Sequence, residues 1–327
     1  MKAVRVSQQQ DQMQVSVESM QLSDLPDHEV LIKVHWSSIN YKDAMSAAGN
    51  KGITRSFPHT TGLDAAGEVV EDASGEFQPG EQVVVIGYDL GMNTWGGHSQ
   101  YIRVPASWPV RLPEGMSGRY AMALGTAGLT AGYCLDKLLT HGYRAEQGPI
   151  LVSGATGGVG SVATMLCSQL GYHTIALTGK ADQHDYLKQL GASDIWPREQ
   201  FKEGSERALM KPDIAAAIDV AGGEQLVTIL KRLQFDGAVA ACGIIDSPEL
   251  HHMIFPFILR GTSLLGVASA DAPRSARERM LAKFAGQWAL PKLEDFCDQI
   301  TLDEVPEIIT NMIDGSNTRR IVVKVSE

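Results

Sequence analysis

The sequence is poor in cysteine. Its 327 residues include only four, Cys134, Cys167, Cys242 and Cys297, and neighbouring cysteines lie at least 33 positions apart. No pair therefore forms the closely spaced CxxC half-site that most structural zinc modules contain, and the sequence predicts no metal site. Thiols scattered in this way are also typical of a reducing compartment, so we expect a cytoplasmic protein.

Long apolar runs and an excess of positive charge are missing as well. No window reaches the roughly 18–20 uninterrupted apolar residues that a membrane-spanning helix requires, and no apolar run follows Lys2 at the N-terminus. Lysines and arginines total 28 against 38 aspartates and glutamates, which gives a formal net charge of −10. A negative protein repels the phosphate backbone of nucleic acids. We therefore expect neither a membrane nor a nucleic-acid partner.

The first third of the chain alternates apolar and polar residues with a period of two. Such alternation with β-branched residues, interrupted by glycine and proline, is typical of half-buried β-strands. Six segments before residue 107 have this character: KAVRV, MQVSVES, EVLIKVHW, AAGEVVE, EQVVVIG and SQYIRV. They predict a β-rich lobe, which we expect to form a barrel.

The pattern changes near residue 120, where near-continuous apolar segments alternate with helical ones. Apolar strands separated by amphipathic helices require a mostly parallel sheet covered on both faces. Five segments read as such strands: 149–154, 173–179, 214–220, 237–242 and 262–268. A charged helix (274–289) and an amphipathic helix (303–314) then lead to the alternating strand RRIVVKV. We predict an α/β fold in which the C-terminus completes the first lobe.

A glycine-rich turn follows the first of the parallel strands. It consists of Gly154, Ala155, Thr156, Gly157, Gly158, Val159 and Gly160, with a strand before it and an amphipathic helix after it. Glycines in this position let backbone amides approach a pyrophosphate at the positive end of the helix. Ala155 replaces the first glycine of the usual G-x-G-x-x-G pattern. The flanking strand and helix favour dinucleotide binding over the alternative of a merely tight turn.

The end of the second parallel strand indicates which dinucleotide binds. In NAD enzymes an acidic residue about twenty positions after the turn accepts hydrogen bonds from the adenosine ribose. Here the strand ends in Thr178, Gly179 and Lys180. A hydroxyl and an ammonium group favour a 2′-phosphate, and no carboxylate repels it, so we predict NADPH as cofactor. The alternative is that Lys180 is an ordinary solvated lysine.

Three tempting motifs lack the context that their chemistry requires. Tyr133 and Lys137 form the YxxxK pattern of short-chain dehydrogenases but precede the glycine turn, which predicts one face of a helix. Segment 97–101 departs from the G-x-S-x-G nucleophile elbow at its last position and lies in the β-rich lobe. His251 and His252 have no metal-ligating partner at useful spacing, so we expect a solvated pair.

Eight ordered blocks of sequence carry a resemblance to a known family. They are HWSSINYKDAM (35–45), FPHTTGLDAAGEV (57–69), WGGHSQY (95–101), LGTAGLTA (124–131), GATGGVGS (154–161), YLKQLGAS (186–193), FPFILRG (255–261) and RRIVVKV (319–325). The chain resembles the medium-chain dehydrogenase/reductase superfamily over essentially its whole length. Within it, the blocks resemble the NADPH-dependent acrylyl-CoA reductases, which are often named quinone oxidoreductases. The resemblance implies a GroES-like β-barrel catalytic domain (1–122 and 270–327), a Rossmann domain with a doubly wound parallel sheet (123–269), and a homodimer.

The resemblance also implies a reaction without zinc. Where the zinc-dependent relatives have a cysteine this chain has Asn40, and where they have G-H-E it has Gly62-Leu63-Asp64. Without a Lewis acid, alcohol oxidation loses its main electrostatic stabilisation, whereas an electron-poor C=C bond needs less help. We expect NADPH-dependent reduction of acryloyl-CoA to propanoyl-CoA. A quinone or 2-alkenal reductase and a non-catalytic NADPH-binding protein are the alternatives.

By resemblance, several residues of the first lobe lie near the cofactor and the substrate. Tyr41 is the candidate for a catalytic residue and for a cofactor contact: its phenol either donates to the thioester oxygen of the enolate, delivers the proton, or packs on the nicotinamide. Arg320 either reaches the cofactor or the acyl-CoA phosphates as a catalytic residue, or is an arginine at a strand edge. Asp64 contacts substrate or holds a backbone turn. Lys51 and Arg55 either bind the coenzyme A phosphates or belong to a solvated loop.

Five further cofactor contacts follow from the resemblance. They are Thr126 near the nicotinamide, Arg198 beside the adenine, Gly243 and Ile244 after one strand, and Ser269 after the last strand. Ligands of open α/β sheets bind outside the carboxyl ends of the strands, which supports this set on physical grounds. For each of the five, simple packing is the alternative.

Overall fold

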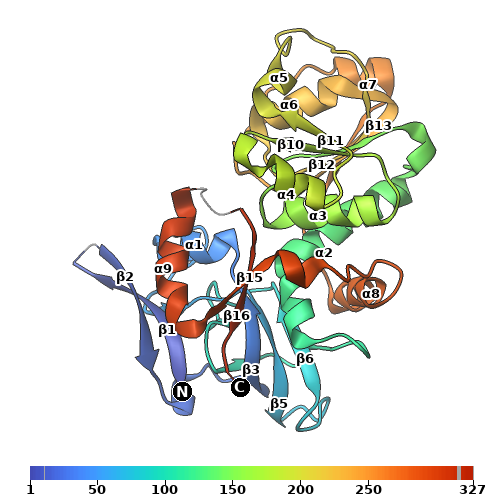
Figure 1. Ribbon diagram of the computed structural model, residues 1–327. Helices are drawn as coiled ribbons and strands as arrows, with labels where there is room; N and C mark the ends of the chain where they lie inside the picture. The colour runs from blue at the N-terminus through green and yellow to red at the C-terminus, as the bar shows by residue number, and fades with distance from the viewer. Residues whose placement is uncertain (11, 315–317, 327) are drawn as a thin grey trace. The chain divides into compact units, whose positions relative to one another are not determined.

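The computed structural model describes residues 1–10, 12–314 and 318–326, which form two compact units (Figure 1). Unit 1 contains Met1–Thr126 and Ala270–Glu327, and unit 2 contains Ala127–Ser269. The sequence places the first change of domain after residue 122, slightly earlier than the structure does. The intervening residues belong to unit 1 because the side chains of Asp64 and Arg320 hold them there.

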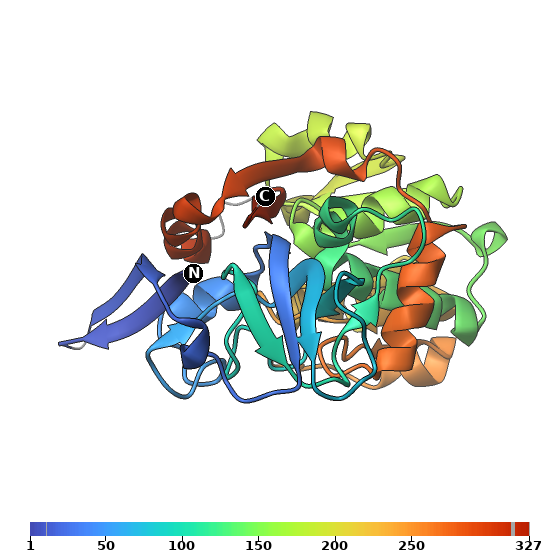
Figure 2. The same ribbon diagram turned by 90° about the horizontal axis from the view of Figure 1, so that it is seen from below.

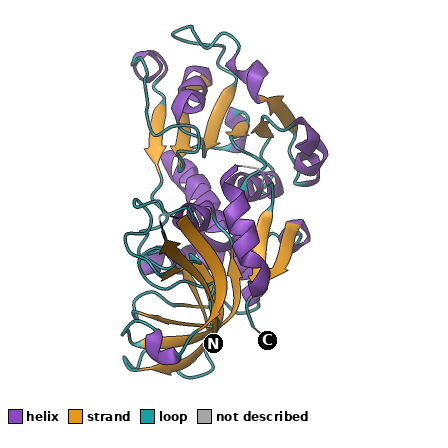
Figure 3. Ribbon diagram, turned by 90° about the vertical axis from the view of Figure 1, so that its left-hand side faces the viewer, coloured by secondary structure: helices purple, strands orange, loops and turns teal. Residues whose placement is uncertain are grey.

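Unit 1 is built on two sheets. The smaller sheet has the order β2-β1-β4, and the larger has the order β15-β16-β3-β5-β6-β8, with β7 also paired to β3. Figure 3 shows the larger sheet as a strongly curved layer. The bounds are β1 Lys2–Gln9, β2 Gln12–Ser19, β3 Val30–Ser38, β4 His59–Thr60, β5 Asp64–Asp72, β6 Gln82–Ile86, β7 Tyr101–Val104, β8 Val110–Arg111, β15 Cys297–Thr301 and β16 Arg320–Lys324.

The alternation of the sequence explains these strands. Along β2, Met13, Val15 and Val17 pack on the apolar core of unit 1, whereas the residues between them are exposed. Side chains of a strand point alternately to its two faces, so one face is buried and the other is solvated. All six strands predicted from alternation are present, as β1, β2, β3, β5, β6 and β7. The β1–β2 hairpin projects beyond the other strands of unit 1 in Figure 2.

The C-terminal strand β16 returns to unit 1, as the alternation of RRIVVKV predicts. It pairs antiparallel with β3, where Val322 lies opposite Ser38, and parallel with β15. Strand β15 has no counterpart among the predicted strands. It is the edge strand of its sheet and most of its residues are exposed and polar, so no apolar alternation marks it.

The helices of unit 1 are short, apart from α8. Their bounds are α1 Tyr41–Ala47, α8 Arg274–Ala285 and α9 Val305–Asn311, and the long helix α2 (Gly118–His141) begins in this unit and continues into unit 2. Helix α8 buries Arg277, Met280, Leu281 and Phe284, which lie on one face at helical spacing. It ends at Ala285, before the predicted residue 289, because Gly286 follows with a non-helical backbone.

Unit 2 is a doubly wound parallel sheet, which confirms the predicted fold class. Its order is β11-β10-β9-β12-β13-β14, and every neighbouring pair is parallel. This is the order of dinucleotide-binding folds, in which the strand sequence reverses beside the first strand. The bounds are β9 Ile150–Val152, β10 Thr174–Thr178, β11 Asp194–Pro197, β12 Ile214–Asp219, β13 Leu233–Ala241 and β14 Ser263–Gly266.

Helices cover both faces of the unit 2 sheet (Figure 1). Helices α3 and α4 pack on β9, β10 and β11, whereas α6 and α7 pack on β13. The bounds are α3 Gly158–Gln169, α4 His184–Gln189, α5 Arg198–Lys202, α6 Gly223–Arg232 and α7 Phe255–Arg260. None of the helices that the structure describes combines the length and the apolar character that a bilayer crossing requires.

Candidate functional site

The glycine turn of unit 2 joins β9 to α3, and its backbone requires glycine at two positions. Gly154 has a φ of +55°, and a Cβ atom there would lie 2.5 Å from Val220 Cγ2. A Cβ atom at Gly160 would lie 2.2 Å from the carbonyl oxygen of Gly154. The first amides of a helix have no acceptor within the helix, so the start of α3 at Gly158 is suited to a phosphate. The turn has the geometry that dinucleotide binding needs.

Ala155 and Thr156 contribute to this turn from within. Both side chains are buried, and the Ala155 N–H donates to the carbonyl oxygen of Leu177 at 3.3 Å. The Gly157 N–H likewise donates to the carbonyl oxygen of Gly154 at 2.9 Å. The amides of Ala155 and Gly157 are therefore used by the protein, and those of Gly158 and Val159, at the start of α3, are better placed for a ligand.

A buried polar pair supports the turn from behind, and sequence analysis missed it. The Ser153 hydroxyl donates to Asp219 Oδ1 at 2.6 Å and accepts from the Val220 N–H at 2.9 Å. Asp219 Oδ2 accepts from the Gly222 N–H at 2.8 Å, and burial raises the pKa of this carboxyl. The pair ties the carboxyl ends of β9 and β12 together. In the sequence, this pair is visible only as a polar residue at the end of each of two apolar strands.

Two basic residues follow the ends of β10 and β11. These strands are parallel, with Thr178 opposite Pro197, so Lys180 and Arg198 follow them at the same edge of the sheet. A Cβ atom at Gly179 would lie 2.6 Å from a terminal nitrogen of Arg198, which shows that the guanidinium lies against this glycine. The Lys180 N–H donates to Thr178 Oγ1 at 3.0 Å. Arg198, which the resemblance places beside the adenine, therefore lies next to Thr178–Lys180, the segment that the sequence assigns to a 2′-phosphate.

The remaining predicted residues of unit 2 lie along the same edge. Gly243 follows β13 so closely that a Cβ atom would lie 2.2 Å from the carbonyl oxygen of Val220. Ile244 is 67% exposed. The hydroxyls of Ser269 and Thr130 share a hydrogen bond of 2.6 Å, which fixes the segment after β14 against α2. All these positions follow the carboxyl ends of parallel strands, where ligands of such sheets bind.

In unit 1, Tyr41 is the first residue of α1 and its side chain is 44% exposed. The start of the helix is fixed by Asp43, which accepts from the Asn40 N–H and from the Gly62 N–H, each at 2.8 Å. Asp43 is completely buried, and burial raises its pKa to about 7. An exposed phenol on a firmly held helix start is suited to contact a ligand, whereas Asp43 serves the helix start.

Asp64 is also completely buried, and four protein groups donate to its carboxylate. Oδ2 accepts from Ser38 Oγ at 2.7 Å, Asn40 Nδ2 at 2.8 Å and the Thr126 N–H at 2.9 Å. Oδ1 accepts from Thr126 Oγ1 at 2.6 Å. With these bonds Asp64 holds a backbone segment, which is one of its two predicted roles, and it is not placed to contact substrate.

Arg320 lies inside unit 1 and not at its surface. The side chain is 3% exposed. Nε donates to the Ala123 carbonyl at 3.0 Å and Nη2 donates to the Met122 carbonyl at 3.1 Å. Nη1 donates to the carbonyl of Ile39 at 3.1 Å and to Asn40 Oδ1 at 3.3 Å. A guanidinium engaged in this way does not reach a phosphate, which argues against the catalytic role expected for Arg320.

Lys51 and Arg55 are exposed on a loop of unit 1. Lys51 Nζ lies 4.6 Å from the centre of the Phe57 ring and donates to the Arg55 carbonyl at 3.4 Å. The Arg55 N–H donates to Asn93 Oδ1 at 3.0 Å, which anchors the loop. Both cationic groups remain at the surface, where a phosphate can reach them.

The two histidines at 251 and 252 differ, which corrects the expected solvated pair. His251 is exposed and contacts Glu249 at 2.7 Å. His252 is half-buried beside the Phe257 ring, and burial lowers its pKa. The Phe257 ring of α7, whose centre lies 6.0 Å from that of His252, shields it on one side.

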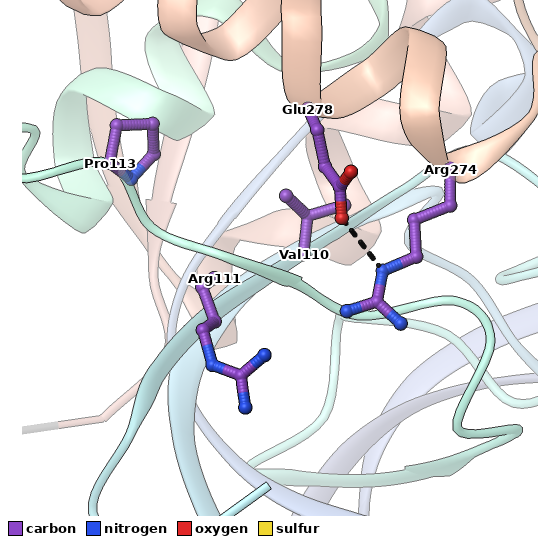
Figure 4. Close-up of a pocket in the computed structure, with 5 residues that line it drawn as sticks. All are labelled: Val110, Arg111, Pro113, Arg274 and Glu278. Atoms are coloured by element: carbon purple, nitrogen blue, oxygen red, sulfur yellow. Dashed lines mark hydrogen bonds and ion pairs between the residues drawn. The ribbon is translucent and has the colours of Figure 1, made fainter. Parts of the chain in front are cut away.

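A small cavity of about 180 Å³ in unit 1 carries no chemistry of its own (Figure 4). Val110, Arg111, Pro113, Arg274 and Glu278 line it. Arg274 Nε lies 3.1 Å from Glu278 and Arg111 lies 3.1 Å from Glu81, so carboxylates neutralise both arginines.

Known protein families match segments in each of the two units. The model of the alcohol dehydrogenase GroES-like domain matches residues 26–114, and that of the zinc-binding dehydrogenases matches residues 158–286. Acrylyl-CoA reductase AcuI of Ruegeria pomeroyi is 39% identical over 313 residues, which cover 96% of this chain and 95% of that protein. YhfP of Bacillus subtilis, named as a quinone oxidoreductase, is 38% identical over 323 residues, 98% of each chain.

Solved structures agree with these matches. The crystal structure of the yhdH oxidoreductase from Salmonella enterica in complex with NADP has a TM-score of 0.96 and 38% identity, and the match covers 100% of both chains. The structure of Bacillus subtilis yhfP with NAD bound also has a TM-score of 0.96 and 38% identity, and the match covers 99% of each chain.

One of the two matching families is named for zinc binding, but the residues that the structure describes do not fit a zinc ion. Within the described part of the chain, no group of three or more His, Cys, Asp or Glu side chains is placed to hold a metal. His98 is completely buried, its ring nitrogens contact Thr61 Oγ1 at 2.9 Å and the Ser38 carbonyl at 3.2 Å, and burial lowers its pKa to about 4. Asn40 and Asp64 bind protein groups instead.

The raised pKa of Asp43 predicts that stability falls as the pH rises through neutrality. A buried carboxyl with a pKa of about 7 holds its proton in the folded state at pH values where the unfolded chain has released it. The bound proton contributes to the free energy of unfolding. This contribution is complete below the ordinary pKa of about 4 and is lost as the pH rises to about 7, and the free energy of unfolding falls by up to about 1.4 kcal/mol per pH unit between these values. Thermal unfolding of the wild type and of Asp43→Asn between pH 5 and pH 8 measures this slope.

Asp43→Asn keeps the side chain uncharged at every pH, as burial favours, so the slope of its unfolding free energy between pH 5 and pH 7 should be flatter than that of the wild type. Asp72→Asn is the control, since Asp72 is not buried and its hydrogen bonds to Ser74 and Phe77 lower its pKa, away from this range. An unchanged slope in Asp43→Asn would contradict the assignment.

Proposed function

The chain belongs to the medium-chain dehydrogenase/reductase superfamily, in the branch that includes AcuI and YhfP, and from this premise we propose an NADPH-dependent reductase of acryloyl-CoA. The product is propanoyl-CoA. The observation that carries the cofactor is that the Arg198 guanidinium lies against Gly179, directly before Lys180, at the edge of the sheet beside the glycine turn. The substrate rests on the 39% identity to AcuI over nearly the whole chain.

The residues of unit 2 fit NADPH, which supplies a hydride when bound. The amides at the start of α3 would hold the pyrophosphate, as helix N-termini do. Thr178, Lys180 and Arg198 would hold the 2′-phosphate, since ammonium and guanidinium groups form charge-assisted hydrogen bonds with it. The nicotinamide end would be held by Thr126, Gly243, Ile244 and Ser269.

Reduction of an electron-poor C=C bond requires stabilisation of the negative charge that develops on the thioester oxygen. Preorganised hydrogen-bond donors provide this stabilisation without a metal. Tyr41 is the donor that we assign, because its phenol is exposed at a helix start that Asp43 holds in place. Proton delivery to the α-carbon completes the reduction, and the same phenol is the group that we assign to it. The phenolate that remains takes up a proton from water at its exposed side.

The phosphates of coenzyme A need a basic patch on this acidic protein. Lys51 and Arg55 offer two exposed cations on an anchored loop of unit 1. Local charge determines the affinity for a phosphate more than the net charge of the chain, because charges beyond about 8–10 Å are screened in physiological salt. We assign the coenzyme A phosphates to this loop.

A quinone reductase is the second candidate function, and the name of YhfP favours it. Quinones and free alkenals lack the phosphate tail of coenzyme A, so they gain nothing from Lys51 and Arg55. The two functions therefore differ in their dependence on this loop.

We further propose a cytoplasmic homodimer. The four cysteines are free thiols, which a reducing compartment maintains. The apolar segment 245–259 of unit 2 exposes Ile245 (68%), Met253 (56%), Ile254 (63%) and Ile258 (68%). It precedes β14, the last strand of its sheet. Exposed apolar segments and open strand edges are typical of subunit interfaces, and a second copy related by a two-fold axis would cover both.

Replacing Lys180 with alanine tests the cofactor. Lys180→Ala should weaken NADPH binding by about 1–3 kcal/mol and leave NADH binding nearly unchanged, because NADH has no 2′-phosphate to lose a charged hydrogen bond. Fluorescence titration with both cofactors measures this difference. Lys188→Ala, at an exposed lysine of α4, is the control for a general loss of charge. An equal loss of binding free energy for NADPH and NADH would contradict the assignment of Lys180 to the 2′-phosphate.

A panel of acceptors tests the substrate. NADPH oxidation is followed with acryloyl-CoA, acrolein and a benzoquinone, for the wild type and for the double variant Lys51→Ala/Arg55→Ala. We expect acryloyl-CoA to have the highest kcat/KM, and the double variant to raise its KM about tenfold while the KM values for acrolein and NADPH stay unchanged. A strong preference for the quinone would replace acryloyl-CoA as substrate, and an unchanged KM for acryloyl-CoA would dismiss the phosphate loop.

A charge placed in the apolar segment tests the dimer. Ile254→Asp/Ile258→Asp should convert a dimer to a monomer, because burying two carboxylates at an interface costs several kcal/mol. Light scattering after size-exclusion chromatography gives the mass. Val70→Asp introduces a carboxylate at an exposed position of unit 1 and should keep the dimer mass. A wild-type mass of one chain would refute the dimer.

A further inference from the structure

Helix α2 is interrupted at Gly125, whose φ of 51° and ψ of −156° are not helical. The interruption gives the helix two additional ends about a third of the way along its length. The residues before it end a helical segment, and Thr126 begins the next one. Helix ends leave backbone carbonyls and amides without partners inside the helix, and such groups are costly when they are buried.

Arg320 satisfies the carbonyl end of the interruption. Its guanidinium donates to the carbonyl oxygens of Met122 and Ala123, both at the end of the first segment. The carbonyl end of a helix carries a partial negative charge, so a cation is the favoured partner there. Arg320 comes from β16, almost two hundred residues later in the chain.

Asp64 satisfies the amide end. Its carboxylate accepts both the backbone N–H and the hydroxyl of Thr126, at 2.9 and 2.6 Å. A carboxylate at this position does what an N-cap residue does, but it comes from β5 and not from the adjacent chain. The backbone N–H and the hydroxyl of Thr126 therefore share Asp64 as a partner.

The two charged groups converge on Gly125. A Cβ atom there would lie 2.6 Å from Asp64 Oδ2, 2.7 Å from Arg320 Nη2 and 2.8 Å from Ser38 Oγ. No other residue fits between them, so glycine, carboxylate and guanidinium form one arrangement. A buried charge whose opposite is removed is left uncompensated, which makes the arrangement sensitive to either substitution.

We propose that Asp64 and Arg320 are positioning residues that hold Thr126 for the nicotinamide end of NADPH. Asp64 fixes the hydroxyl and the amide of Thr126 directly, and Arg320 fixes the segment that precedes it. This inference rests on the proposed cofactor site, since it gives Thr126 a ligand to meet. It also replaces the catalytic role expected for Arg320 with an indirect one.

A double-mutant cycle tests the action of Asp64 through Thr126. Asp64→Asn and Thr126→Val each remove part of the same interaction, and each should raise the Kd of NADPH about 5- to 20-fold. The double variant should bind NADPH no more weakly than the weaker of the two single variants, because the interaction can be lost only once. Fluorescence titration gives Kd, and thermal unfolding is recorded for every variant.

Arg277 provides a matched control for Arg320. It is equally buried in unit 1 and donates to the carbonyls of Ile86 and Ala270, far along the chain from Thr126. Arg320→Met and Arg277→Met should both lower the Tm, but only Arg320→Met should raise the Kd of NADPH. If Arg320→Met does not fold, Arg320→Lys keeps the charge and should retain part of the affinity.

Two results would overturn the inference. One is a double variant whose loss of affinity is the product of the two single losses, which means that Asp64 and Thr126 act independently. The other is an equal loss of NADPH affinity in Arg277→Met, which means that general destabilisation causes the effect. If Lys180→Ala weakens NADPH while Asp64→Asn does not, the inference fails and the cofactor site stands. If the wild type does not bind NADPH, the proposed function fails.

Discussion

The buried carboxylate of Asp64 is the interaction on which the ligand-facing part of unit 1 depends. Four donors converge on it from β3, from the start of α1 and from the interruption of α2. Through Asn40 it is connected to the segment that presents Tyr41, and through Thr126 to the segment assigned to the nicotinamide. A charge buried at this depth is tolerated only because hydrogen bonds replace its water. The same bonds restrict where these segments can lie.

In unit 2 the corresponding role belongs to a smaller pair. Ser153 and Asp219 lie at the ends of neighbouring strands, and together they fix the two loops that start there. Both units thus have a buried carboxylate with several hydrogen-bond donors behind an element that we assign to ligand binding. Rigid support of this kind lowers the ordering cost when a ligand binds. These supporting residues act through contacts with distant parts of the chain, so the neighbouring sequence does not reveal their roles.

Local pattern was enough to predict most strands and the glycine turn, because periodicity and turn chemistry are properties of neighbouring residues. It failed at β15, where an exposed polar edge strand has no apolar face to alternate. It also failed for Arg320: its strand was predicted, but the direction of the side chain depends on the carbonyls of Met122 and Ala123, which the fold brings near. The roles of Asp64 and Gly125 also depend on residues far apart in the sequence. The carboxylate lies where only a glycine leaves room for it, and neither requirement is visible in the neighbouring residues. The burial of His252 likewise arises from packing around α7.

The return of the chain to unit 1 has a consequence for folding during synthesis. Unit 2 is one continuous segment, Ala127–Ser269, and all six of its strands have emerged from the ribosome well before the end of translation. Unit 1 is different, because β16 is almost the last part of the chain to be made and pairs with β3 near its beginning. Domains generally fold as units and in order of synthesis. Unit 1 is therefore the first unit to be started and the second to be completed. Arg320, which binds the carbonyl end of the first segment of α2, is synthesised after all the residues that it contacts.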